Sequence, residues 1–99
     1  MAIKVDFYPK AEVEYNDAFN WYEDQLEGLG ARFEYSIEKA IHNIINRPLS
    51  YPNKKYDCRE YVVEGFPYLI IYKLYAETKT LLILSVFHTS RNPKEKYRI

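Results

Sequence analysis

The sequence has one cysteine, Cys58, among 99 residues. A single cysteine cannot form a disulfide within the chain, so nothing in the sequence requires an oxidising compartment. The chain also lacks a run of about 18 apolar residues, which a membrane-spanning helix needs. Its first residues place Lys4 and Asp6 between apolar neighbours, unlike the unbroken apolar stretch of a signal peptide. These absences predict a cytoplasmic protein with no membrane partner.

Glycine and metal-binding side chains are scarce as well. The only three glycines are at positions 28, 30 and 65, so no glycine-rich loop for nucleotide phosphates is present. His42, His88 and Cys58 lie far apart along the chain and lack the spacing of a zinc site. A serine hydrolase elbow is also absent. We therefore expect neither a cofactor nor a metal.

Tyrosine, by contrast, is abundant. Eleven tyrosines belong to a set of 17 aromatic residues, within a composition that is 47% hydrophobic and 28% charged. Such a composition is typical of a folded protein, and this length suits a single domain spanning residues 1–99. A core of this size is too small for so many rings. Several of them are therefore expected at a groove or a partner surface.

The charges are divided unevenly between the two halves. Residues 1–50 contain 5 Lys and Arg against 9 Asp and Glu, whereas residues 51–99 contain 9 against 5. The first half therefore carries a net charge of −4 (5 minus 9) and the second +4 (9 minus 5). If the second half presents one surface, that surface could attract phosphate. This positive surface would attract phosphate more weakly than a wholly basic domain does.

Apolar periodicity predicts a strand and then two helices in the first half. Residues 3–7 alternate between apolar and charged, as in a strand with one buried face, and Pro9 ends this pattern. From Ala11 to Leu29, apolar residues recur every three or four positions, which predicts a helix that stops where Gly28 and Gly30 bracket Leu29. A second stripe over residues 33–45 predicts a second helix ending before Pro48. The two helices should form an antiparallel hairpin.

The second half predicts a loop and three strands. Residues 46–57 contain two prolines and a lysine pair, which is typical of a loop. Residues 58–63, 68–75 and 80–88 are rich in strand-forming residues, and short connections make them an antiparallel meander. Residues 81–87 are apolar at nearly every position, which predicts a central strand. The predicted fold is α+β: an N-terminal strand, then a two-helix hairpin packed on a mainly antiparallel four-stranded sheet.

Short motifs occur along this order of elements over nearly the whole chain. They are Trp21-Tyr22-Glu23, Gly28-Leu29-Gly30 and Phe33 in the helix hairpin; Pro48 and Tyr51-Pro52 in the loop; Arg59, Phe66-Pro67-Tyr68, Ile70 and Tyr72 in the strands; and His88, Arg91 and Pro93 after them. No single motif is specific, but in their order and spacing these motifs resemble the RelE/ParE family of bacterial toxins.

The resemblance implies the toxin of a type II toxin–antitoxin pair, neutralised by a cognate antitoxin that wraps a groove or adds to a sheet edge. Within the wider family, some members are ribosome-dependent, metal-independent endoribonucleases that cut mRNA, and others inhibit DNA gyrase by binding it. Phe66-Pro67-Tyr68 together with residues 88–93 looks closer to the ParE, or plasmid stabilisation, side. The alternatives are a RelE-like nuclease and an inactive relative that only binds an antitoxin. A homodimer is a further open alternative.

Candidate site residues follow from what metal-free RNA cleavage needs: a base for the 2'-OH, cations for the phosphate and an acid for the leaving oxygen. For a nuclease, the catalytic candidates are Arg59, His88, Arg91 and Tyr97. The candidates for contact with nucleic acid are Lys54, Lys55, Arg59 and Arg91.

Each candidate also has a purely structural interpretation. His88 at a strand end can be a hydrogen-bonded structural residue, and Arg91 can anchor the tail. Whichever target the protein has, we expect Arg59, His88 and Arg91 to share one recognition surface; without it, the functional interpretation rests on the family resemblance. The modest positive charge favours a protein target over RNA.

Overall fold

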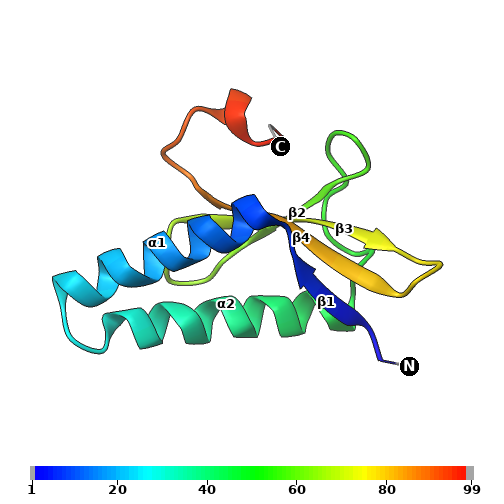
Figure 1. Cartoon of the computed structure of the whole chain (residues 1–99). Coiled ribbons are helices and arrows are strands. Elements are labelled where there is room, and N and C mark those ends of the chain that lie inside the picture. Colours follow the sequence, from blue (N-terminus) through cyan, green and yellow to red (C-terminus); the bar gives the residue numbers. More distant parts are fainter. Residues whose placement is uncertain (1, 98–99) are drawn as a thin grey trace.

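The order of helices and strands agrees with the sequence patterns. The computed structural model describes residues 2–97 and confirms the predicted α+β fold (Figure 1). None of the helices within these residues is long and apolar enough to cross a membrane. The elements are β1 (Lys4–Phe7), α1 (Pro9–Gln25), α2 (Leu29–Asn46), β2 (Arg59–Val62), β3 (Tyr68–Tyr75), β4 (Thr80–His88) and a short 3-10 helix, η1 (Pro93–Glu95).

The four strands form one mixed sheet in the order β1-β4-β3-β2. β2, β3 and β4 pair as the predicted antiparallel meander, whereas β1 pairs with β4 in parallel. Parallel strands cannot be joined by a tight turn and need a long connection. Here the helix pair and two further strands lie between β1 and β4 in the chain and provide it. β4 therefore lies between β1 and β3, as expected for the most apolar strand.

A bulge in β4 changes which side chains face the helices. Ile71 of β3 pairs with Ser85, but Tyr72 pairs with Ile83, so Leu84 has no partner in the register. The extra residue shifts the alternation by one position. Ile83 and Val86 consequently both pack in the cluster on the helix side, while Leu84 packs in a second cluster on the opposite face. β4 is thus buried on both faces.

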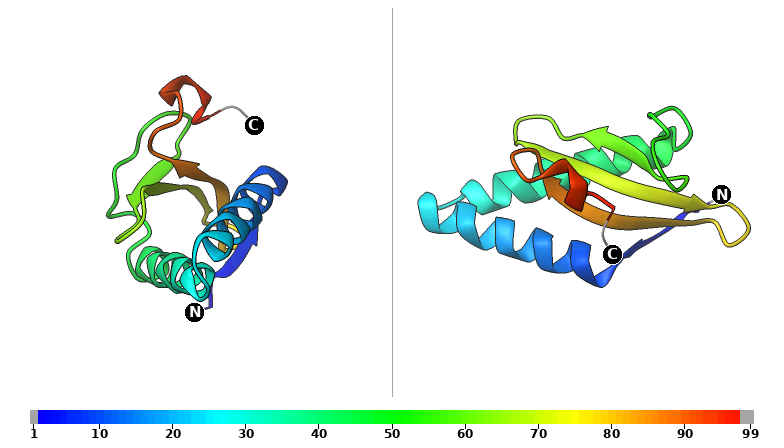
Figure 2. Two further views of the ribbon diagram at one scale, coloured as in Figure 1. Left: turned by 90° about the vertical axis from the view of Figure 1, so that its left-hand side faces the viewer. Right: turned by 90° about the horizontal axis from the view of Figure 1, so that it is seen from above.

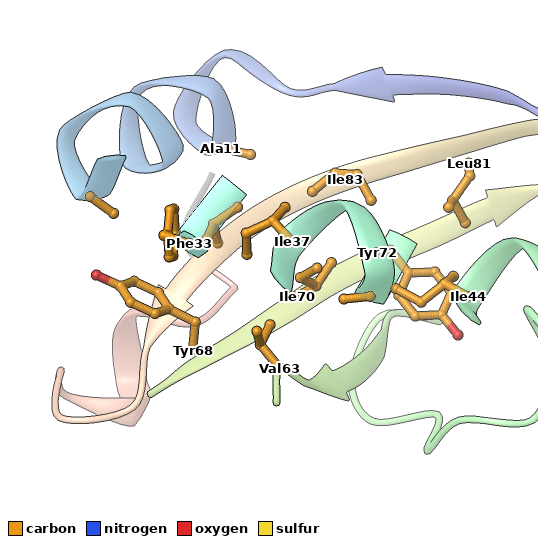
Figure 3. Close-up of a cluster of buried hydrophobic side chains, with 13 residues drawn as sticks. Ala11, Phe33, Ile37, Ile44, Val63, Tyr68, Ile70, Tyr72, Leu81 and Ile83 are labelled. Atoms are coloured by element: carbon orange, nitrogen blue, oxygen red, sulfur yellow. The ribbon is translucent and has the colours of Figure 1, made fainter. Parts of the chain in front are cut away.

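The main core lies between the helix pair and the sheet (Figure 3). α2 supplies Phe33, Ile37 and Ile44, each less than 2% exposed, and its sequence stripe predicted this face. Tyr72 of β3 is also fully buried, and its hydroxyl donates a hydrogen bond of 2.7 Å to the Pro48 carbonyl. The core therefore holds the loop after α2 by a polar contact as well as by packing.

The helix hairpin turns earlier than the apolar stripe suggested. α1 ends at Gln25, Leu26 is 61% exposed, and Leu29 begins α2 instead of ending α1. Gly28, at φ +89°, makes this turn in the left-handed region that favours glycine. The Glu23 carboxylate accepts hydrogen bonds from the Gly28 and Gly30 backbone N–H groups, at 3.0 and 2.9 Å. Tyr22 before the turn and Phe33 after it pack in the same core, whereas Leu26 and Leu29 between them are not part of it.

A single carboxylate closes the edge of β4 where β1 stops. β1 pairs with β4 only as far as Ile83, so the next part of β4 lies beside α1. There Glu14 accepts hydrogen bonds from the Val86 backbone N–H (3.0 Å) and the Ser85 hydroxyl (2.8 Å). Its second oxygen pairs with Arg91 at 2.5 Å. Glu14 thus links α1, the strand edge and the tail.

Replacing Glu14 should be costly. Glu14→Ala leaves the Val86 N–H and Ser85 hydroxyl without their acceptor and removes the partner of Arg91, so we expect the free energy of unfolding to fall by about 3 kcal/mol. Asp17→Ala removes an exposed carboxylate from the same helix and should change it by less than about 0.5 kcal/mol. Urea unfolding followed by circular dichroism measures both. Equal stability of the two variants would contradict the assigned role of Glu14.

Alkaline pH should destabilise the protein through Tyr72. Burial raises the pKa of its phenol to about 12, whereas in the unfolded chain the pKa is about 10. Between these values the unfolded state releases a proton that the folded state keeps, so stability falls as the pH rises. Urea unfolding over this window should give a shallower decline for Tyr72→Phe, which also loses about 1 kcal/mol at neutral pH. Tyr35→Phe, at an exposed ring, serves as the control; a Tyr72→Phe slope equal to that of the unchanged protein would refute the assignment.

Candidate functional site

The C-terminal tail lies on the sheet face that the helices leave open. Figure 2 shows η1 on the opposite side of the sheet from α2. Tyr97 packs against the second apolar cluster, whose buried members are Cys58, Ile71, Leu84 and Phe87. Burial is also the main cause that raises the pKa of the Cys58 thiol. The candidate Tyr97 is therefore part of a packed layer.

Glu60 anchors this tail. It alternates with Arg59 and Tyr61 along β2, and its carboxylate, about 10% exposed, faces the tail. Its oxygens accept hydrogen bonds from the Tyr97 hydroxyl and from Lys96 Nζ, the latter at 3.4 Å. Burial and then the bond to Glu60 raise the pKa of Tyr97 above its ordinary value. A phenol held in this way keeps its proton, so it is a poor general base.

Lysines gather around the tail. A cleft of about 530 Å³ lies between the loop before β2 and the tail. It brings together the two nucleic-acid candidates Lys54 and Lys55 with two further lysines and two tyrosines. The lining residues are Lys54, Lys55, Tyr56, Glu60, Pro93, Lys94, Lys96 and Tyr97. We name this group the lysine cleft.

Arg59 does not join the lysine cleft. Its guanidinium donates hydrogen bonds to the carbonyl oxygens of Tyr51 (2.7 Å) and Leu49 (3.2 Å). Tyr61, two residues further along β2, lies on the same face of the strand as Arg59, and its hydroxyl accepts a hydrogen bond from Asn43 of α2. Arg59 therefore points to the helix side and holds the loop, while the cleft opens on the other side.

His88 and Arg91 line a different cleft, of about 270 Å³, between α1 and the end of β4. The His88 ring lies edge-on to Tyr68, with centroids 5.0 Å apart, and its Nδ1 accepts from the Ser90 backbone N–H at 3.1 Å. Arg91 pairs with Glu14 and, at 3.2 Å, with Glu95. His88 is thus hydrogen-bonded at the end of its strand, and Arg91 anchors the tail, as their structural interpretations predict.

The candidates thus divide into three places. Lys54, Lys55 and Tyr97 meet in the lysine cleft, His88 and Arg91 meet beside α1, and Arg59 supports the loop. The single surface expected for Arg59, His88 and Arg91 is not formed. Among the described residues, no group of three His, Cys, Asp or Glu side chains could hold a metal ion.

Sequence reasoning missed Glu14 and Glu60, which hold the two clefts in place. Glu14 stands one position before Tyr15 of the apolar stripe and resembles the other acidic residues of α1. Glu60 had a usable signal, because a carboxylate inside a strand, with Arg59 and Tyr61 on the opposite face, needs a partner.

Arg59 should be needed for the order of the loop. Arg59→Ala removes two charge-assisted bonds, together about 2 kcal/mol, so opening of residues 47–58 should become roughly 30-fold more frequent. Limited trypsin digestion after Lys54 and Lys55 measures this opening. Arg47→Ala removes an exposed arginine near the same loop and should leave the rate unchanged. Equal cleavage rates of the two variants would contradict the assignment.

Comparison with known proteins identifies the family. A family profile described as the ParE toxin of type II toxin–antitoxin system, parDE, matches residues 5–93. No sequence in a comparison with curated proteins matches the chain.

Solved structures share the fold. The isolated RelE toxin of E. coli has a TM-score of 0.67 at 18% identity, covering 94% of this chain and 90% of that one. A chain of the intact E. coli RelBE toxin–antitoxin complex has a TM-score of 0.67 at 20% identity, covering 91% and 100%. A chain of the chromosomal ParDE system of P. aeruginosa has a TM-score of 0.62 at 13% identity, covering 89% and 97%. With the profile spanning most of its length, the chain belongs to the ParE toxin family of type II toxin–antitoxin systems.

Proposed function

We propose that this toxin inhibits growth by binding a protein target such as DNA gyrase, and that a cognate antitoxin neutralises it. The observation that carries the proposal is that the catalytic candidates are bonded to other groups of the protein itself. Arg59 binds loop carbonyls, Arg91 binds two carboxylates and Tyr97 binds Glu60. RNA cleavage needs such groups to converge on one phosphate. Here they serve the fold and lie in separate places.

The antitoxin partner has its own support. The family profile is that of a toxin–antitoxin system, and similar folds occur in the RelBE complex and the ParDE system. A neutralising partner is a property of such systems. For this chain we expect the gene beside it to encode a small protein that binds the toxin tightly.

A supercoiling assay tests the target. Relaxed plasmid, gyrase and ATP are incubated with the purified toxin, and we expect supercoiling to be lost at micromolar toxin concentrations. Adding the product of the neighbouring gene before gyrase should restore supercoiling, because the antitoxin occupies the toxin first. Full supercoiling in the presence of excess toxin would refute the gyrase proposal.

The lysine cleft favours a second candidate function, cleavage of ribosome-bound mRNA. Four lysines and two tyrosine rings around one cleft supply cations for phosphate and surfaces for base stacking. Glu60 offsets part of this charge. Among residues 2–97, the cleft is lined by no histidine or arginine, so the proton transfers would fall to lysine or tyrosine.

Mapping transcript ends after brief toxin expression separates the two functions. The protein-binding proposal expects intact transcripts. Codon-dependent cuts that disappear in a Lys54→Ala, Lys55→Ala double variant would instead establish the nuclease. Lys39→Ala, at an exposed lysine of α2 outside the cleft, is the matched control and should leave any cuts unchanged.

A further inference from the structure

The outer edge of β1 is unpaired in the described part of the chain. The Lys4 backbone N–H donates to the carbonyl of Lys79, just before β4 (2.9 Å), and the Tyr8 backbone N–H donates to the carbonyl of Ile83 in β4 (2.8 Å). Successive residues of a strand direct their backbone groups to opposite sides, so Val5 faces away from β4. The same alternation turns Phe7 outward. No hydrogen bond of residues 2–97 outside the β1–β4 ladder involves the backbone of either residue.

Other margins of this sheet are covered at least in part. Along β2, Glu60 N donates to Pro52 O (3.2 Å) and Lys54 N to Cys58 O (2.8 Å), so the preceding loop occupies part of that edge. On β4 beyond β1, Glu14 accepts from Val86 N. β1 has no such cover, and Figure 2 shows it at the margin of the sheet. An open edge of this kind is a template for another strand.

We propose that the β1 edge is a self-association site, at which β1 of a second copy of this chain pairs antiparallel around a twofold axis at Val5. In this register Val5 lies opposite Val5 of the second copy, and Ile3 lies opposite Phe7. These are the residues whose N–H and C=O groups point outward, so each pair exchanges two backbone hydrogen bonds. The two sheets join into one continuous eight-stranded sheet.

The charges of β1 suit this register. Lys4 and Asp6 lie on the same face of the strand, with Nζ and Oδ2 3.7 Å apart and side chains 72% and 47% exposed. In the proposed pair, each Lys4 lies directly opposite Asp6 of the second copy. A lysine alone on an edge strand discourages pairing. Opposite charges across two strands favour it, so here the charged face is complementary to itself.

The other face of β1 also gains from pairing. Ile3, Val5 and Phe7 pack against the main core but are only partly buried. Pairing brings Ile3 against Phe7 of the second copy and the two Val5 side chains together, which removes more apolar surface from water. Because the strand is short, the interface falls below about 1,200 Å², the lower end for stable complexes. We therefore expect a weak dimer, with a dissociation constant of roughly 10 µM to 1 mM.

Charge reversal tests the pairing. Lys4→Asp and Asp6→Lys each place like charges opposite one another in the homodimer, so each variant alone should dimerise at least about tenfold more weakly. When the two variants are mixed, every pair across the interface is again Lys with Asp, so association should return. Sedimentation equilibrium from about 5 µM to about 1 mM brackets the expected constant. Glu12→Lys changes the net charge as Asp6→Lys does, but on α1, and should dimerise like the unchanged protein.

Val5→Pro provides a second, uncharged test. Proline removes an N–H that the monomer does not use and keeps an extended backbone, so the fold should survive while the dimer is lost. Circular dichroism checks the fold of each variant. If Val5→Pro fails to fold, the mixing experiment still decides. Three results would each overturn the proposal: a monomer at every concentration, a dimer unaffected by Val5→Pro, or charge variants that do not associate on mixing. A monomer at every concentration would leave the edge to an extended segment of another protein.

Discussion

The carboxylate of Glu14 is the contact on which the arrangement of this molecule depends. β1 is too short to cover all of β4, and the uncovered part of a central strand in a small domain would leave a buried N–H without a partner. α1 carries Glu14 to this position, where one side chain replaces the missing strand. Its second oxygen then fixes Arg91, which sets the direction in which the tail leaves the sheet.

The bulge at Leu84 makes this arrangement possible. Without the extra residue, Val86 would face the tail and its backbone N–H would point towards β3. With it, Val86 joins the core under the helices and presents its N–H to Glu14. Leu84 and Phe87 meanwhile supply the second face with enough apolar surface to hold Tyr97. A single irregularity thus connects the helix pair, the strand edge and the tail.

The two sheet faces have different roles as a result. One is filled by the helix pair and contributes stability. The other carries a thin layer of tail, which Glu60 anchors and the lysines of the lysine cleft border. Four of the nine Lys and Arg residues in the second half of the sequence thus line the cleft where the loop before β2 meets the tail. The candidate arginines lie elsewhere. Their guanidinium groups form charge-assisted hydrogen bonds with carboxylates or backbone carbonyls of the protein itself.

Local patterns determined the elements of this protein and their order. The alternation in β1, the stripe of α2 and the apolar run of β4 each report which side of an element is buried, and burial is a property that neighbouring residues share. The positions of single polar side chains were decided by the tertiary structure. Arg59, Glu60 and Glu14 find partners 8 to 77 residues away in the sequence. A charged group bonds to whatever the fold brings within about 3 Å, so its role exists only once the chain has closed around it.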